Sequence, residues 1–415
     1  MNSANSMRAE IRDHRHPRIL APSMFLVAVI LANLTALWFA VYKILPLTLF
    51  AMGLLLFAAF RPVASVSLRR VIPGGVALIA VYLYIGLASN WAPNPKAATD
   101  EFMIVLLAMA PALFFGYFFG SRFTAEEIGL AFSFVPFIFI VQALYNRYAG
   151  GDAMLIGEFS IRSLLGGISC LTTPLLLSVY LQRCRALAGI TFLLSFLLVI
   201  LIQSRSSIII VLPVLMYMIS RYSRRAFVAA LLFGCLLAFV FVTFNVGQVT
   251  ERFTTENTTL DISEAVLDEA IKPVEDRVDF DRRMAAFVSA QLFAENPWLG
   301  AGYMSVFQTN EGVYGLGVVS HGFLPGTAGE LGLVGLGLIL IFFYQLYRMG
   351  RYVNACAFSA STSVISIGFW YGLAALVMYG FFHQTFESAI FGMAVGVAFG
   401  LTASAPSTQQ NGRRS

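Results

Sequence analysis

Hydrophobic residues form long runs along most of this chain, and short polar or charged breaks separate the runs. A helix that crosses a bilayer needs about 20 apolar residues, since each helical residue rises about 1.5 Å. The runs at 44–60 and 206–220 fall below about 18 residues, so they need a thinner bilayer or shielding by protein. The pattern predicts twelve spanning helices, at Ala21–Tyr42, Ile44–Phe60, Val71–Ala88, Phe102–Phe119, Ile128–Tyr145, Ser163–Leu181, Ala186–Ile202, Ser206–Ser220, Ala226–Phe244, Phe323–Leu346, Ser361–Phe382 and Ser388–Ala403.

One long polar stretch, Asn245–Ser320, interrupts this pattern and predicts a functional loop outside the membrane. Inside it, 262–271 and 280–295 have the composition of short amphipathic helices. The second would be capped by Asp279 or Asp281 and would end at Asn296 and Pro297. The expected order is a basic tail at 1–20, nine spans at 21–244, the loop at 245–320, three spans at 321–403 and a polar tail at 404–415.

The overall composition agrees with a membrane protein. Of 415 residues, 58% are hydrophobic and only 12% are charged, and the mean hydropathy is +0.78, which excludes a water-soluble globular fold. The expected fold class is therefore an all-α polytopic membrane protein with about twelve transmembrane helices and one long outer loop. The four cysteines lie far apart in sequence, so neither a disulfide framework nor a Cys-x-x-Cys metal site is indicated.

Charge separates the two sides of the predicted topology. The termini and the breaks on their side carry a net charge of +13, whereas the opposite side carries −8. Because arginine and lysine concentrate in cytoplasmic loops, we expect both termini to be cytoplasmic and Asn245–Ser320 to face outward. The first span is expected to act as a retained anchor, without a cleavable signal peptide.

Histidine is scarce on the outer side, where only His321 and His383 are predicted to lie. His321 falls between the long loop and the tenth span, where an imidazole could act as a general base or simply cap the helix. This scarcity argues against a histidine-rich metal site, and no phosphate-binding loop, dinucleotide fingerprint or aspartate-rich motif is present. We therefore expect no metal, cofactor or nucleic-acid partner.

On a continuous helix, Gly332 would lie about 20° and Gly335 about 40° from His321, so all three would share one face. Small residues allow a neighbouring helix to approach closely, and packing is therefore the simpler interpretation of these glycines. Glu330 would lie on the opposite face, where its carboxylate could bond a neighbouring helix or handle protons.

Four of the arginines predicted on the outer side are candidates for binding an anion: Arg162, Arg205, Arg282 and Arg283. Their guanidinium groups could bind pyrophosphate, a specific anion that an outer surface of net charge −8 would not otherwise attract. Simpler interpretations are contact with lipid headgroups for Arg162 and salt bridges to nearby aspartates for the pair in the loop. Arg205 lies in a tight turn between two short spans, where a simple anchoring role is less expected.

Several motifs together resemble the O-antigen ligase and polymerase superfamily of bacterial surface-glycan assembly. His321, Gly332 and Gly335 fit the ligase motif, although Gly322 replaces its usual Asn, Ser or Gln. A loop helix with Asp281 and Arg282, followed by Pro297, Gly300 and Gly302, also matches the family, although Ala286 replaces its usual tryptophan. Further matches are Ser204 with Arg205, Arg162, and Trp91–Pro95.

This resemblance implies a metal-independent, inverting transfer of a glycan from undecaprenyl diphosphate at the periplasmic face of the bacterial inner membrane. His321 would deprotonate the acceptor hydroxyl, and Arg205, Arg282, Arg162 and Arg283 would hold the diphosphate. Glu330, Gly332 and Gly335 would support this site.

The acceptor is left open by the sequence. A ligase would transfer the glycan to lipid A core, whereas a polymerase would join it to a second lipid-linked glycan. A small-anion transporter is a further alternative, because a buried Glu330 could serve transport, but no inverted repeat is evident. A scaffold role would leave His321 and the outer arginines without a common purpose.

Overall fold

A computed structural model describes about half of the chain, and helices dominate it. The described residues are 67–122, 128, 155–156, 159–160, 162–183, 186–201, 205–222, 224–225, 227–228, 232, 278–314, 323–357, 363–381 and 389–405. Their elements are η1 (Leu68–Arg70), α4 (Ile72–Ala88), η2 (Ser89–Trp91), α5 (Pro95–Arg122), β1 (Leu155–Ile156), β2 (Phe159–Ser160), α8 (Arg162–Arg183), α9 (Ala186–Leu201), α10 (Arg205–Tyr222), α14 (Val278–Glu295), α15 (Ser305–Tyr314), α16 (Phe323–Ala357), α17 (Ser363–Gly380) and α18 (Ala389–Ser404). The only sheet among them is the antiparallel pair β1–β2, with Leu155 opposite Ser160.

The predicted apolar runs in the described part coincide with helices, so the all-helical prediction is confirmed there. Three of these helices are long and apolar enough to cross a membrane: Ile72–Trp91, Pro95–Ser121 and Gly326–Ala355. The predicted spans at 21–42, 44–60, 128–145 and 226–244 lie outside the described residues apart from a few positions, as does the predicted helix at 262–271. The count of twelve stays a prediction.

Three helices have bounds that differ from those of the predicted segments. Helix α5 begins at Pro95 rather than Phe102, because Asn94 caps it: the Asn94 side-chain oxygen accepts a hydrogen bond from the Ala97 amide at 3.2 Å. Helix α16 continues to Ala357, since its arginines end the apolar run without ending the helix. Helix α14 begins at Val278, so Asp279 lies inside its first turn and does not cap it. The predicted end at Glu295 was correct.

Helix α18 is buried along almost its whole length, and α5 is its closest neighbour. Glycines four residues apart on each helix bring the two backbones into contact. A methyl group added at Gly396 would overlap the Leu113 carbonyl, and one at Gly120 would overlap the Val397 carbonyl. Close approach through small residues is how helices associate inside membranes, where apolar surfaces gain little by leaving lipid.

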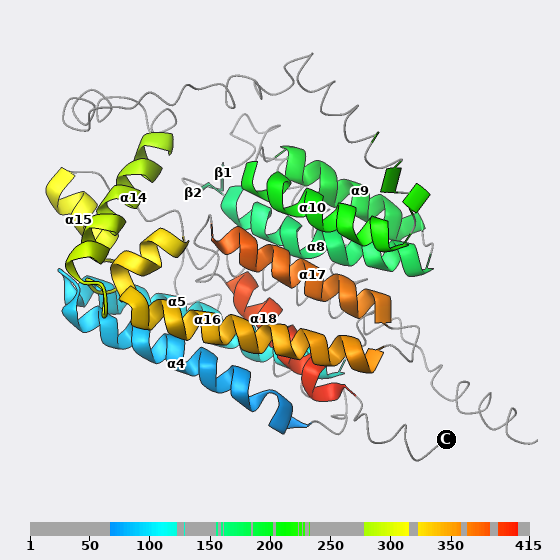
Figure 1. Ribbon diagram of the computed structural model, residues 1–415, viewed down its shortest axis with the longest axis horizontal. Coiled ribbons are helices and arrows are strands. Elements are labelled where there is room, and N and C mark those ends of the chain that lie inside the picture. The colour runs from blue at the N-terminus through cyan, green and yellow to red at the C-terminus, as the bar shows by residue number, and fades with distance from the viewer. Residues whose placement is uncertain are drawn as a thin grey trace, which may run out of the picture.

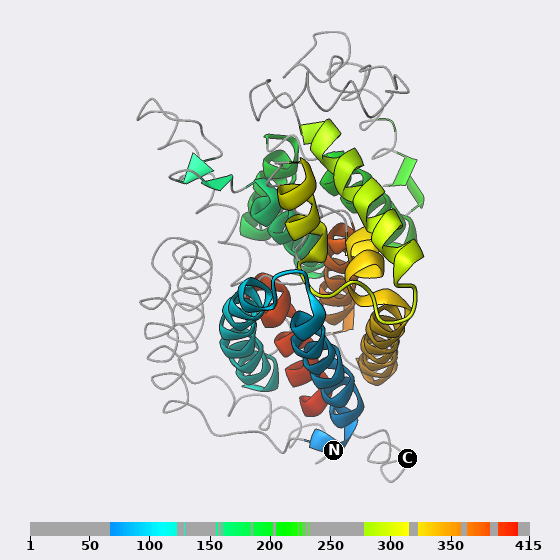
Figure 2. The same cartoon turned by 90° about the vertical axis from the view of Figure 1, so that its left-hand side faces the viewer.

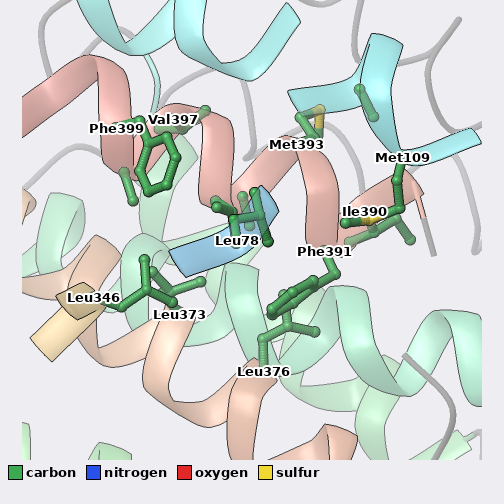
Figure 3. Close-up of a cluster of buried hydrophobic side chains, with 14 of the residues drawn as sticks. Leu78, Met109, Leu346, Leu373, Leu376, Ile390, Phe391, Met393, Val397 and Phe399 are labelled. Carbon is green, nitrogen blue, oxygen red and sulfur yellow. The ribbon is translucent and has the colours of Figure 1, made fainter. Parts of the chain in front are cut away.

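The largest described core surrounds α18. Side chains from α4, α5, α16 and α17 converge on it, as Figure 3 shows for Leu78, Met109, Leu346 and Leu373. A second core joins α8, α10 and α17 around Val211. Figure 1 shows α8, α9 and α10 side by side, with α17 between them and α16. The helices therefore form one bundle.

The two ends of the bundle differ in charge. The described arginines of the predicted cytoplasmic breaks lie where α4 begins, where α5, α8 and α10 end, and in the last third of α16. There the Arg70 guanidinium lies 4.8 Å from the centre of the Tyr352 ring and donates a hydrogen bond to the Ala405 carbonyl. Helices α14 and α15 cover the opposite end of the bundle, as Figures 1 and 2 show.

Candidate functional site

Helix α16 is interrupted at Gly332, near the end of the bundle that α14 and α15 cover. Gly332 has φ +62° and ψ −165°, a conformation open essentially to glycine alone. Such a break leaves helical amides and carbonyls without their usual partners four residues away. The assumption of a continuous helix through Gly332 was therefore wrong, because Gly335 lies beyond the break.

A turn from the long loop, Pro297–Tyr303, fills this break. The amides of Leu333 and Val334 donate to the carbonyls of Pro297 and Trp298 at 2.9 and 3.1 Å. In return, the amides of Ala301 and Gly302 donate to the carbonyls of Gly329 and Glu330, both at 2.9 Å. Two hydrogen bonds within a helix are thus replaced by four between segments.

Glycine is required on both sides of this junction. A methyl group at Gly332 would lie 2.5 Å from the Gly300 amide nitrogen and 2.5 Å from the Trp298 carbonyl oxygen. Gly300 and Gly302 also have positive φ, at +75° and +105°. Gly300 and Gly302 belong to the motif that begins at Pro297, which we write PxxGxG, and Gly332 belongs to the ligase motif. The structure brings these two motifs into direct contact.

Helix α4 holds the junction from the side. The Tyr84 hydroxyl lies 3.0 Å from the Leu299 carbonyl oxygen and 3.2 Å from that of Leu331. The Tyr303 amide donates to the Ala88 carbonyl at 3.3 Å. The sequence carries no sign of this role for Tyr84, because a tyrosine in an apolar run has the appearance of an ordinary core residue. Only its hydrogen bonds to Leu299 and Leu331 show that it holds the junction.

Helix α15 ties the turn to the Trp91–Pro95 segment. The Gln308 side-chain oxygen accepts from the Asn94 amide at 2.7 Å, and the Gln308 side-chain nitrogen donates to the Asn94 carbonyl at 3.2 Å. The Trp91–Pro95 motif therefore lies beside the PxxGxG turn. Sequence analysis did not predict α15, since its ten residues are largely polar.

Helices α8 and α10 begin beside each other, and α17 ends there. A methyl group at Gly166 would lie 2.7 Å from the Ser207 hydroxyl and would overlap the Tyr379 hydroxyl. Arg162 is the first residue of α8 and Arg205 the first of α10. The structure thus places two of the predicted anion-binding residues at neighbouring helix N-termini, where partial positive charge favours an anion.

Arg282 and Arg283 lie in the second turn of α14. Helix α14 packs against α15 and against the first half of α16, where a methyl group at Gly329 would lie 2.8 Å from the Ser289 carbonyl oxygen. Figures 1 and 2 show α14 beginning on the side of the bundle where α8 and α10 begin. The backbone positions of the four arginines therefore share one end of the molecule.

His321 and His383 lie outside the described residues, as do Gly322 and Ser204. His321 precedes the first residue of α16 by two positions in sequence. Glu330 is half-buried in the last turn before the break, and its backbone carbonyl is engaged by Gly302. Within the described residues, no group of three or more His, Cys, Asp or Glu side chains could hold a metal ion.

One comparison with known proteins identifies this region. Residues 190–340 match the family model described as O-antigen ligase. This segment is therefore similar to the O-antigen ligase family. The predicted resemblance is thereby confirmed for a segment that contains Arg205, the α14 arginines, His321 and the broken part of α16, while Arg162 lies before it. No curated protein matches the chain significantly.

Proposed function

We propose that this protein is a membrane glycosyltransferase that transfers a glycan from undecaprenyl diphosphate to an acceptor hydroxyl. The observation that carries the proposal is the O-antigen ligase match at 190–340, which encloses Arg205, Arg282 and His321. The placement of the helices that begin with Arg162 and Arg205, and of the start of α14, at one end of the bundle supports it.

The proposed chemistry is a single displacement at the anomeric carbon. His321 accepts the proton of the acceptor hydroxyl as its oxygen bonds to that carbon. The bond from the carbon to the diphosphate oxygen breaks on the other face, and undecaprenyl diphosphate leaves with the electron pair. The configuration at the carbon is inverted. The family resemblance implies that no metal takes part.

The arginines stabilise the negative charge that builds on the departing diphosphate. Guanidinium groups bind phosphate oxygens in pairs, and the N-termini of α8 and α10 add partial positive charge. Arg162 and Arg205 would act at these termini, and Arg282 with Arg283 would act from α14. Such preorganised charge lowers the barrier without reorganising during the reaction.

We propose lipid A core as the acceptor, following the ligase description of the matched family. Gly322, which departs from the ligase motif, favours the alternative of a polymerase that joins two lipid-linked glycans. The site would face the periplasm from the bacterial inner membrane, in keeping with the basic breaks at the opposite end of the bundle.

The experiment is glycan transfer by the purified protein in lipid nanodiscs, with lipid-linked glycan as donor and lipid A core supplied or omitted. Arg205→Ala should lower transfer about 10²- to 10³-fold, and Arg205→Lys should restore only part of it. Arg351→Ala is the matched control, because Arg351 is an exposed arginine at the opposite end. Equal loss in Arg351→Ala, or full activity in Arg205→Ala, would contradict the diphosphate role. Extension of the donor without lipid A core would identify a polymerase.

A further inference from the structure

The turn that fills the break in α16 carries two exposed apolar side chains. Trp298 is 69% exposed and Leu299 is 54% exposed in the isolated chain. Their backbone is held rigidly, because the carbonyls of Pro297, Trp298 and Leu299 accept hydrogen bonds from Leu333, Val334 and the Tyr84 hydroxyl. The exposure is therefore a fixed feature of a well-anchored turn.

The turn lies beside two segments that are long and apolar enough to cross a membrane. Tyr84, which contacts it, lies seven residues before the end of the apolar segment Ile72–Trp91, or about 10 Å along the helix. Val334, which donates to Trp298, lies inside the apolar segment Gly326–Ala355. The turn thus runs beside the last two turns of α4.

The two helices that the turn contacts also carry exposed apolar side chains. On α4 these are Leu83 and Leu87, and on α16 they are Leu333 and Val334. The exposed faces of α4 and α16 are the surfaces that spanning helices present to lipid. Trp298 and Leu299 therefore add exposed apolar surface next to that of α4 and α16.

We propose that Pro297–Leu299 is a re-entrant segment that contacts the lipid bilayer at its interface, with Trp298 and Leu299 as its anchors. Tryptophan is enriched at this depth, where the ring meets hydrocarbon and its N–H meets water. Irregular backbone at this depth requires internal hydrogen bonds, and α16 supplies them. The long loop is then fastened to the membrane beside the break. This inference goes beyond the proposed function and does not depend on it.

The test measures the collision of a nitroxide label with oxygen, which concentrates in lipid, and with a water-soluble nickel chelate. Full-length protein in nanodiscs, with its four cysteines replaced by alanine, carries the label at Leu299→Cys. Leu83→Cys is the lipid-facing reference. Gly312→Cys is the water-facing control, because Gly312 is exposed on α15 with open space around it.

We expect the label at 299 to favour oxygen over the chelate, as at 83, and the label at 312 to show the reverse. Access of the chelate at 299 equal to that at 312 would overturn the proposal in favour of a water-facing surface that could bind another protein. Low access of both reagents at 299 would also overturn it.

A second measurement avoids cysteine replacement. Brominated lipids quench tryptophan that contacts the bilayer, so Trp298→Phe should reduce the quenched part of the fluorescence relative to wild type. Equal quenching in both proteins would contradict lipid contact at this residue.

Discussion

At the scale of single residues, Gly332 determines the shape of α16. Its backbone conformation excludes side chains, and its α-carbon faces the Gly300 amide and the Trp298 carbonyl without room for a methyl group. Both glycines belong to motifs that the sequence suggested. From sequence alone, however, we interpreted Gly332 as a packing residue, because the segment that replaces its helical hydrogen bonds lies some thirty residues earlier in the chain.

Gly332→Ala should therefore destabilise the protein by about 1–3 kcal/mol, through backbone strain and overlap with the turn. Gly337→Ala is the matched control on the same helix, since a methyl group there meets no atom within 4 Å. Thermal unfolding in detergent measures the difference. Equal unfolding temperatures for the two variants would contradict the account of the break.

At the scale of elements, the apolar runs predicted helices well where burial alone determines them. The run at 186–202 became α9 within one residue, because its composition leaves no other structure in a membrane. Helix and predicted span differ where charge ends the apolar run, as at Arg348 in α16. Charged residues mark the edge of the membrane, and the backbone hydrogen bonds of a helix can continue past it.

The sequence predicted which residues could form the candidate site, but not how they are arranged in space. Arg162 and Arg205 follow different polar breaks, and no local pattern indicates that α8 and α10 begin side by side. That neighbourhood depends on Gly166, whose missing side chain leaves room for the Ser207 and Tyr379 hydroxyls. Such contacts between distant segments are not encoded in hydrophobic periodicity.

The contact between α5 and α18 offers a test at this scale. Gly396→Ala would press a methyl group into the Leu113 carbonyl, so the helices must separate, at a cost of about 1–3 kcal/mol. Gly75→Ala, with open space around it on α4, serves as the control. A drop in unfolding temperature for Gly396→Ala alone is expected. Unchanged stability would show that the two backbones are not in contact.

At the scale of the whole molecule, the distribution of charge predicts its orientation. The described arginines of the basic breaks gather at one end of the bundle, and α14 and α15 cover the other. Because positive charge is retained in the cytoplasm, the end with α14 and α15 should face outward. The net charges of +13 and −8 on the two predicted sides carry the same expectation for the rest of the chain.

Reporter fusions measure this orientation directly. Alkaline phosphatase, which is active only outside the cytoplasm, should be active when fused after Thr258 and inactive when fused after Ser223. The reverse pattern would place the starts of α8, α10 and α14 in the cytoplasm, away from a periplasmic glycan.

The central proposal is that His321 removes the proton of the acceptor hydroxyl. Its most direct test is glycan transfer by purified His321→Ala protein in nanodiscs, with His383→Ala as the control for the other histidine that the sequence predicts on the outer side. Loss of a general base lowers the rate about 10²- to 10⁴-fold, whereas loss of a helix cap costs only about 1 kcal/mol of stability. The account predicts normally folded His321→Ala protein with that loss of transfer, and His383→Ala protein that keeps most of its activity. Near-normal transfer by His321→Ala would contradict it.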